Sequence, residues 1–320
     1  MRIGVDAMGG DYAPLEAVRG AFEAARINTD CQVVMFGEKS TIEAVCTQEG
    51  ISSSSFEAID CPTQIEMGEH PVKAFSSKQD SSIVVGFRHL AEGKIDAFLS
   101  AGNTGAMLVG SLMSVGAIPG IDRPCLTTLV PRLNNHPGLL LDVGANTDCK
   151  PENLLQFAIL GSVFYGAVNK VENPKVGLLN IGEEEEKGSI FTRSTYALLK
   201  STGGINFVGN VEGRDIFGDE CDVIVCDGFI GNVIIKVCEG MYYRLAKRGV
   251  QDEYLDKFNF KHYGGSTILG VNAPVIVGHG ISKSDTFVKM IESAAEEIGS
   301  GMIQKIKDVV AAHINPQATT

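Results

Sequence analysis

With 320 residues, of which 44% are hydrophobic and 21% charged, the chain is long enough to bury a large core in one domain or in two lobes. Its formal net charge of −12 argues against nucleic-acid binding, which needs a basic surface. The sequence has no run of about 18 apolar residues, and its first apolar stretch is too short for a signal peptide, so we expect neither a membrane span nor secretion. The eight cysteines are scattered without a C-x-x-C pair, which indicates a reduced, cytosolic protein.

The first part of the chain alternates short apolar runs with helical patterns. Predicted strands cover 3–5, 32–36, 56–59 and 95–99, and predicted helices cover 14–25, 39–48, 81–91 and 104–115. Periodicity fails between 61 and 78, and this irregular segment could cover a cleft.

The second part continues the alternation. Two apolar strands, 126–130 and 139–141, are joined by a hairpin-like connection, PRLNNHPG. Helices are predicted at 151–168 and 189–199, strands at 206–208, 223–226 and 275–277, and one long amphipathic helix at 285–313. We expect a single α/β catalytic domain over 1–320, with two lobes around one cleft as an option and an aromatic-basic segment, 241–263, at its periphery.

The stretch 222–240 shows most clearly how the predicted strands end. Residues 223–226 form an apolar run without charge, as expected of a strand buried on both faces of a parallel sheet. Asp227 and Gly228 stop this strand, and Gly231 and Asn232 lead into a helical pattern. Such a junction points backbone N–H groups and the positive end of a helix dipole at whatever lies above the sheet.

The same succession of apolar strand, small polar turn and helix recurs at Asp6, Ser100, Leu141 and Asn180. In open α/β sheets such strand ends gather on one edge, where ligands bind. Gly, Asp, Asn and Ser are ordinary turn formers as well, but their repetition favours an anion-binding edge.

The expected fold is therefore α/β, with a mostly parallel sheet flanked by helices. We expect Asn103, Lys187 and Asn232 to meet at one cleft, within about 20 Å of one another, because a drug-sized pocket is far smaller than that.

Familiar catalytic motifs are missing at these strand ends. In GEEEEKGS, from Gly182, the lysine precedes the second glycine, and four acids stand where a P-loop would cradle phosphates. No G-x-G-x-x-G follows a strand, no G-x-S-x-G elbow occurs, and the six histidines lack metal-ligand spacing, so we expect no cofactor and no metal. The pattern suits a reaction in which inorganic phosphate attacks a thioester while the protein cradles the phosphate and stabilises an oxyanion.

A set of strings, in the same order, resembles the bacterial acyl-acyl-carrier-protein:phosphate acyltransferase family: DAMGGDYAP, SAGNTGAM, LDVGAN, NIGEEEEKG, GNVEGRD, DGFIGNV and GHGIS. The resemblance covers nearly the whole chain. It implies a fold similar to that of the isocitrate/isopropylmalate dehydrogenase and phosphotransacetylase group. It also implies formation of acyl phosphate from phosphate and acyl carrier protein thioesters for phospholipid synthesis, by a cytoplasmic homodimer at the inner face of the membrane.

The sequence departs from the family pattern in two places. YGGSTILG stands at 263–270 where the family usually has YGGAPLLG. The segment between Gly240 and Tyr263 is shorter than the family's usual helical hairpin, which is implicated in membrane contact. We expect catalysis to survive both departures, whereas the second bears on peripheral membrane contact.

The resemblance implies catalytic roles for Lys187, beside phosphate or the oxyanion, and for Asn232. Without it, Lys187 reads as a solvated lysine that balances the acids at 183–186, and Asn232 reads as a helix cap. Phosphate or substrate binding is expected at further strand-end residues, namely Asp6, Gly9, Gly10, Asn103, Thr104, Gly105, Asn146, Asp227, Gly228, Gly231 and His279.

Several of these residues have structural alternatives. Asn103 and Thr104 also suit the cap of the following helix. Asp6 and Asp227 either orient donors or simply close turns. His279 follows a strand, a position where a hydrogen-bonded core histidine is more common than a catalytic one.

The acidic carrier protein implied by the family needs a basic surface on which to dock. The best candidates are Arg244, Lys247 and Arg248, with Lys257 and Lys261 further along, and the alternative is ordinary helix-surface charge. The helix after Asn232 and the C-terminal helix carry apolar stripes that favour a two-fold dimer.

Two other classes of function are alternatives. A sugar kinase of the actin-like type would use IGVDAMGG as a phosphate loop, but the second hairpin of the D-x-G-G-T kind is not found. A scaffold that gathers lipid-synthesis partners through the aromatic-basic segment would bind carrier protein without acting on any acyl donor.

Overall fold

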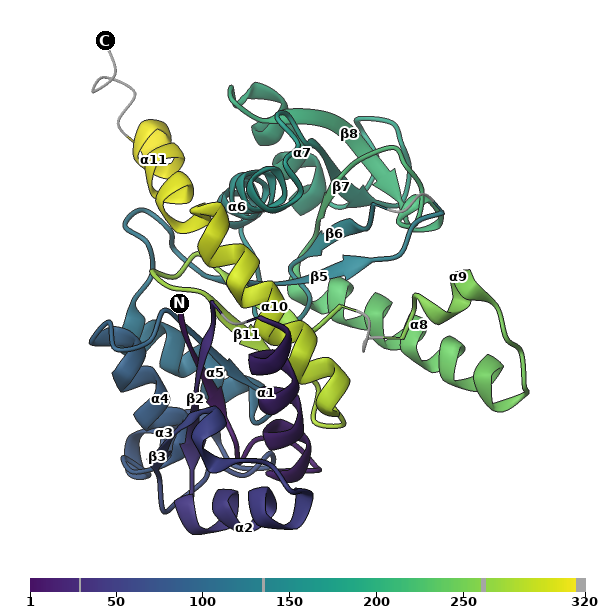
Figure 1. Ribbon diagram of the computed structural model, residues 1–320. Coiled ribbons are helices and arrows are strands. Elements are labelled where there is room, and N and C mark those ends of the chain that lie inside the picture. Colours follow the sequence, from purple (N-terminus) through teal and green to yellow (C-terminus); the bar gives the residue numbers. More distant parts are fainter. Residues whose placement is uncertain (29, 134–135, 260–262, 315–320) are drawn as a thin grey trace. The chain divides into compact units, whose positions relative to one another are not determined.

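The computed structural model describes residues 1–28, 30–133, 136–259 and 263–314 (Figure 1). The chain forms two compact units, each built from separate stretches of sequence. The first unit comprises Met1–Ala117 with Lys261–Gly299, and the second comprises Ile118–Phe260 with Ser300–Thr320.

The first unit is built on strands in the order β3-β2-β1-β4-β11-β10. Their bounds are β1 Arg2–Asp6, β2 Gln32–Gly37, β3 Glu57–Asp60, β4 Ala97–Ser100, β10 Ser266–Leu269 and β11 Val275–Val277. Neighbouring strands are parallel, apart from the antiparallel pair β10 and β11. The helices are α1 Leu15–Ile27, α2 Lys39–Glu49, α3 Pro71–Ser77, α4 Ser82–Ala91, α5 Thr104–Gly110 and α10 Ser284–Ser300.

Alternating side chains of these strands build a core on each face of the sheet. Ile3 and Val5 of β1 belong to a buried cluster with residues of α1 and with Phe287 of α10. On the other face Phe98 of β4 meets Phe87 of α4 with ring centroids 5.1 Å apart in an edge-on arrangement. This period of two is what a strand buried on both faces requires.

The second unit is built on strands in the order β5-β6-β9-β7-β8. Their bounds are β5 Cys125–Val130, β6 Gly138–Leu141, β7 Lys175–Asn180, β8 Asn206–Glu212 and β9 Val223–Val225. The predicted hairpin between β5 and β6 is antiparallel, and the other neighbours are parallel. The helices are α6 Pro151–Asn169, α7 Ile190–Ser201, α8 Gly228–Lys247, α9 Glu253–Asp256 and α11 Met302–Ile314.

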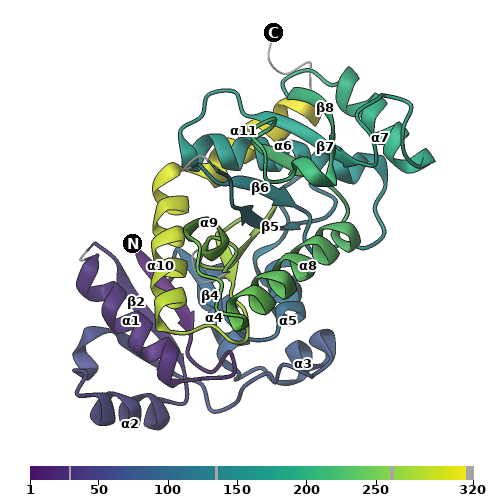
Figure 2. The same cartoon turned by 90° about the vertical axis from the view of Figure 1, so that its right-hand side faces the viewer.

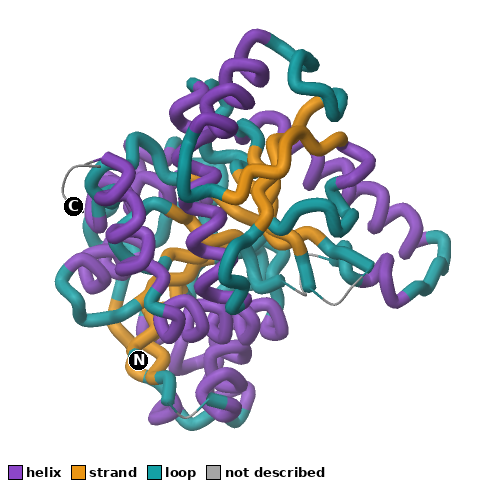
Figure 3. Tube along the Cα trace, turned by 90° about the horizontal axis from the view of Figure 1, so that it is seen from above, coloured by secondary structure: helices purple, strands orange, loops and turns teal. Residues whose placement is uncertain are grey.

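Helices cover the strands within each unit (Figure 3). In the second unit α6 packs on β6, β7 and β9 and is itself covered by α11, while α7 packs on β7 and β8 (Figure 1). Figure 2 shows α8 and the short α9 that follows it. Beyond α9, the Asn259 amide donates to the Tyr242 hydroxyl of α8 at 3.4 Å. In the described part of the chain, no helix combines the length and the apolar character that crossing a bilayer demands.

The α/β fold with a mostly parallel sheet is confirmed, and three boundaries differ from expectation. Residues 71–77, expected to be irregular, form α3, which begins at Pro71, a residue well suited to the first helical turn. The single helix expected at 285–313 is two helices, because Gly301 has a φ of +65°, a left-handed conformation that ends α10. Helix α8 begins at Gly228, earlier than predicted, with Asp227 as its cap.

Candidate functional site

Asp6, at the end of β1, joins two strand ends of the first unit. Its side chain is 1% exposed; Oδ2 accepts from the Ser100 hydroxyl at 2.6 Å, and Oδ1 accepts from the Met8 N–H at 3.0 Å. Burial raises the pKa of Asp6, while the hydrogen bonds from Ser100, Ser82 and Met8 lower it. Asp6 therefore holds together the loops that follow β1 and β4, and its role in orienting phosphate-binding donors remains a prediction.

Glycines allow these two loops to pack together. A Cβ on Gly9 would lie 2.5 Å from Asp6 Oδ2 and 2.7 Å from the Gly102 nitrogen, so a side chain does not fit there. Gly10 has a φ of +100°, which other residues rarely adopt. His279 is half-buried in the loop after β11, and the neighbouring Gly278 N–H donates to the Ser100 carbonyl at 2.8 Å. The structure thus brings Asp6, Gly9 and the loop of His279 together at one edge of this sheet.

The side-chain amide of Asn103 is hydrogen-bonded to a loop distant in sequence and is not available to bind a ligand. Its Oδ1 accepts from the Ala106 N–H at 3.0 Å, which caps α5. Its Nδ2 lies within hydrogen-bond distance of three carbonyls, those of Glu66 at 3.0 Å, Met67 at 3.2 Å and Glu69 at 3.0 Å. The capping alternative is therefore correct for the side chain, and phosphate binding at this turn remains a prediction that depends on its backbone.

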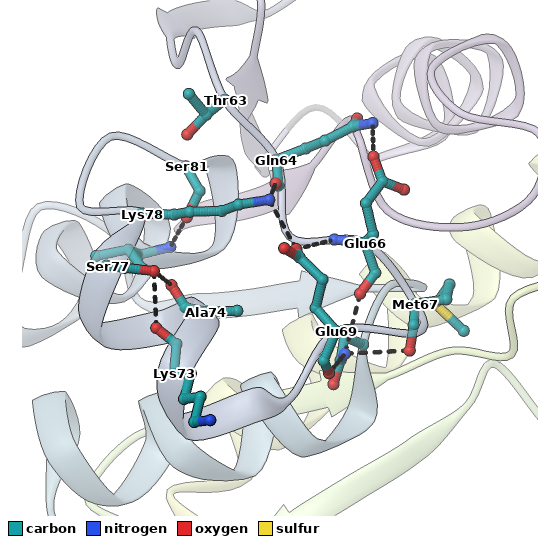
Figure 4. A network of polar contacts seen from close by, with 12 residues as sticks. Thr63, Gln64, Glu66, Met67, Glu69, Lys73, Ala74, Ser77, Lys78 and Ser81 are labelled. Atoms are coloured by element: carbon teal, nitrogen blue, oxygen red, sulfur yellow. Dashed lines mark hydrogen bonds and ion pairs between the residues drawn. The ribbon is translucent and has the colours of Figure 1, made fainter.

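The fastened loop is itself cross-linked (Figure 4). Lys78 Nζ donates to the Gln64 carbonyl at 2.8 Å and to Glu69 Oε2 at 2.7 Å, and the same carboxylate accepts from the Glu66 N–H at 2.8 Å. Gly105, in the first turn of α5, packs so closely on Pro71 of α3 that a Cβ would overlap the ring. Residues 64–78 are therefore held by hydrogen bonds and packing beside the Asn103–Thr104 turn.

Asp142, after β6, organises the strand ends of the second unit, and the sequence reading missed it. It is completely buried and accepts hydrogen bonds from the N–H groups of Leu126 at 2.9 Å, Ala145 at 3.1 Å and Asn146 at 2.7 Å. Burial raises the pKa of Asp142, and these donors lower it. The Asn146 amide donates to Asp142 Oδ2 at 2.9 Å and to the Pro124 carbonyl at 2.8 Å, so it too holds the loop.

The start of α8 corrects the expectation of a free Gly-Asn loop. Asp227 Oδ1 caps the helix by accepting from the Ile230 N–H at 2.9 Å. The Gly228 N–H donates to the Asn146 carbonyl at 2.7 Å, and the Gly231 N–H donates to the Asp227 carbonyl at 3.0 Å. Both backbone donors are engaged. The two glycines instead let α8 approach the loop of Asp142, where Cβ atoms would overlap backbone or carboxylate oxygens.

Asn232 lies in the first turns of α8 and points toward the loop after β6. Its Nδ2 donates to the Val143 carbonyl at 3.2 Å. On an α-helix its direction is about 160° away from those of both Ile230 and Ile234, which line a pocket described below. Its catalytic role stays a prediction.

Lys187 lies on the loop between β7 and α7. Its carbonyl accepts from the Asn180 amide at 3.2 Å, and the next residue, Gly188, has a φ of +90°. The side chain is 48% exposed, and Nζ lies 4.0 Å from Glu184 Oε2. A contact this long on the surface holds the lysine weakly, so Lys187 is free to turn toward a substrate.

A pocket of about 730 Å³ opens beside this loop within the described part of the second unit. Its apolar lining is Leu154, Leu179, Ile181, Phe191, Ile230 and Ile234. Its polar lining includes Asn180, Ser189, Thr192, Glu212, Arg214 and Asp227. In the described residues Lys187 does not line the pocket, although Gly188 and Ser189, which follow it, do. Ser189 and Arg214 were not predicted; the GNVEGRD string was the only signal for the latter.

The residues expected to bind the partner are on the surface. Arg244, Lys247 and Arg248 are all exposed at the C-terminal end of α8, and Arg244 Nη1 donates to the Gly240 carbonyl at 3.0 Å. Lys257 is half-buried after α9, and Lys261 lies outside the described residues. Asn103 belongs to the first unit and Lys187 and Asn232 to the second, so their meeting at one cleft remains a prediction.

The chain is similar to known proteins over nearly its whole length. A family model described as "Fatty acid synthesis protein" matches residues 1–248. A phosphate acyltransferase of Caldicellulosiruptor bescii is 42% identical over 331 aligned residues, covering 98% of this chain and 99% of that protein. A phosphate acyltransferase of Thermoanaerobacterium thermosaccharolyticum is 43% identical over 326 aligned residues, covering 96% of each.

Solved structures agree with the fold. A phosphotransacetylase from Streptococcus pyogenes superposes with a TM-score of 0.66 at 18% identity, covering 93% of this chain and 94% of that one. A branched-chain phosphotransacylase from Enterococcus faecalis superposes with a TM-score of 0.62 at 15% identity, covering 93% and 99%. The predicted similarity of the fold to that of the phosphotransacetylase group is confirmed.

Proposed function

This chain belongs to the phosphate acyltransferase family and is an acyltransferase, and we propose that it converts an acyl-carrier-protein thioester and inorganic phosphate to acyl phosphate and free carrier protein. The similarity to phosphate acyltransferases over almost the full length carries this proposal. The product would feed glycerophospholipid synthesis.

The proposed reaction needs one displacement. A phosphate oxygen attacks the thioester carbonyl carbon and forms a C–O bond, giving a tetrahedral oxyanion. Collapse of this oxyanion breaks the C–S bond, and the electron pair leaves with the carrier thiolate. Lys187 stabilises the oxyanion electrostatically, and such donors supply much of the rate enhancement in acyl transfer.

No acyl-enzyme is proposed. Cys226 lines the pocket, but burial raises the pKa of its thiol well above the usual value, as it does for Cys125. A thiol that stays protonated is a poor nucleophile.

Phosphate binding is proposed at Asn232 and at the backbone of the turn Thr104–Gly105, with Asp6, Asp227 and His279 in supporting positions.

The test is incubation of the protein with palmitoyl-carrier protein and inorganic phosphate, followed by trapping of acyl phosphate as its hydroxamate. We expect phosphate-dependent acyl phosphate and stoichiometric free carrier thiol. Release of free fatty acid without phosphate, or an acyl group found on a cysteine of the protein, would refute the proposal. Binding of carrier protein without turnover of any donor would favour the scaffold alternative.

We propose that the carrier protein docks on the basic end of α8. Reversing Arg244, Lys247 and Arg248 to Glu is expected to raise the KM for the carrier-linked donor about tenfold, because charges at an interface rim mainly change association. The KM for phosphate should stay unchanged. Reversal of the exposed Lys39 and Lys94, in the first unit, is the control. An unchanged KM for the donor in the triple variant would exclude docking there.

The same segment, 241–263, is proposed to touch anionic lipid weakly from the cytoplasmic side. Exposed Tyr243 lies among the basic residues, a mixture of aromatic and basic side chains that suits a membrane surface. Cosedimentation with phosphatidylglycerol vesicles that is lost in the triple variant would support the contact, and sedimentation independent of these charges would contradict it.

A two-fold dimer through α8 is also proposed. The apolar stripe expected to join it from the C-terminal helix is instead buried within the chain, as at Phe287, Ile291 and Ile306. Phe229, Val233, Val237 and Met241 follow one another at four-residue steps and are 60%, 45%, 59% and 55% exposed. Such a stripe on one helix face favours a closed interface with a second copy. Light scattering should give twice the mass of one chain, and Val237→Glu should halve it. A monomeric mass for the unaltered protein at micromolar concentration would rule the dimer out.

A further inference from the structure

We propose that the pocket of the second unit holds the fatty acyl chain of the donor and that Ile234 and Phe191 limit the length of chain it accepts. This inference rests on the proposed function and adds the residues that set specificity. The pocket volume, about 730 Å³, lies in the range of roughly 300–1,000 Å³ that is usual for small-molecule sites.

The lining has the character that an alkyl chain requires. Leu154, Leu179 and Cys226 are 1%, 9% and 4% exposed and belong to the rigid core around α6, β7 and β9. Phe191 of α7 and Ile234 of α8 are half-buried at its sides. Ile230 is 42% exposed, so an acyl chain in the pocket would cover apolar surface that now faces water.

Several polar lining residues lie at one end of the pocket. Asn180, Glu212 and Asp227 stand at the C-terminal ends of β7, β8 and β9, next to the loop of Lys187. Ile234 is seven residues beyond Asp227 on α8, which places it about 10 Å further along the helix. The reacting carbonyl therefore belongs at the strand ends, and the acyl chain runs from there toward Ile234.

The charges argue against an anionic occupant such as a nucleotide. Arg214 is already paired with Glu212 at 2.8 Å and lies 3.6 Å from both Glu183 and Asp215. An uncharged hydrocarbon chain meets no repulsion in the body of the pocket, whereas the phosphates of a nucleotide buried beside Arg214 would meet these acids. Inorganic phosphate is proposed outside this lining, at Asn232 and the backbone of the turn Thr104–Gly105.

The experiment compares kcat/KM for palmitoyl- and octanoyl-carrier protein in Ile234→Trp and Phe191→Ala. Ile234→Trp should lower the palmitoyl-to-octanoyl ratio at least about tenfold, since a misfit of one or a few methylenes in an apolar pocket changes rates ~10–200-fold. Phe191→Ala should raise the ratio, because removing the ring enlarges the space for the longer chain. Val208→Trp, on a 45% exposed residue of β8 outside the pocket, is the control and should leave the ratio unchanged.

A second measurement does not depend on turnover. Binding of cis-parinaric acid, a fluorescent fatty acid, should weaken at least about tenfold in Ile234→Trp and stay unchanged in Val208→Trp. Circular dichroism and melting temperature show whether each variant is folded. If the wild-type protein forms no acyl phosphate, but probe binding is weakened in Ile234→Trp and unchanged in Val208→Trp, the proposed reaction is refuted while the assignment of the pocket to an acyl chain stands. Equal loss with both chain lengths, or unchanged probe binding in folded Ile234→Trp, overturns the pocket assignment.

Discussion

Replacing Lys187 with alanine is expected to lower the turnover of acyl phosphate formation at least tenfold, a cautious floor under the ~10²–10³ typical for loss of an oxyanion donor. The ammonium group lies on a loop whose next residues line the pocket, and its contact with Glu184 at 4.0 Å is too long and too exposed to hold it there. Because the side chain is about half exposed, the fold should persist in the variant.

Lys200→Ala is the matched control for this prediction. Lys200 is also exposed, and its Nζ lies 2.6 Å from Glu185 in the same acidic stretch, but it sits at the far end of α7. Turnover should be nearly unchanged in this control and in the alanine variants of the cysteines that do not line the pocket. Asn232→Ala should also lose at least about tenfold. Near-normal turnover in both the lysine and the asparagine variants would defeat the mechanism.

The sequence was sufficient to predict the α/β fold because its strands are short apolar runs that end in recognisable turns. The buried run at 223–225 and the turn at Asp227 are local features, and local patterns can be read directly. The start of α8 was misplaced because glycines at 228 and 231 suggest a loop. In the structure they are helical, and their lack of a side chain serves contact with the loop of Asp142.

The site was predictable only in part, because several polar residues act through partners far along the chain. The Asn103 amide is engaged by carbonyls 34–37 residues earlier, and nothing near Asn103 in the sequence indicates this. The length of the C-terminal helix likewise depended on the left-handed conformation of Gly301. The apolar pocket gathers α6, β7, α7 and α8, which no periodicity brings together.

Replacing Asp142 with alanine is expected to lower the free energy of unfolding by on the order of 3 kcal/mol, because one buried and three part-buried N–H groups lose their acceptor and a buried unsatisfied group costs about 1–3 kcal/mol. The donors come from Leu126, Gly144, Ala145 and Asn146. Turnover should fall as well, since the same loop supports α8 near Asn232. Denaturant unfolding measures the first effect, and the acyl phosphate assay measures the second.

Two companion variants separate the carboxylate's hydrogen bonds from the mere presence of a side chain. Asp142→Asn keeps one acceptor oxygen, which can still serve the Leu126 N–H, but places an NH2 group against the two donors of Asn146, at 2.7 and 2.9 Å in the native protein. Asp142→Asn should therefore lower the free energy of unfolding measurably, but by less than the alanine variant does. Asp148→Ala alters an exposed residue of the same loop and should change stability by no more than about 0.5 kcal/mol. Equal stability of the Asp142→Ala and Asp148→Ala proteins would show that Asp142 does not organise these strand ends.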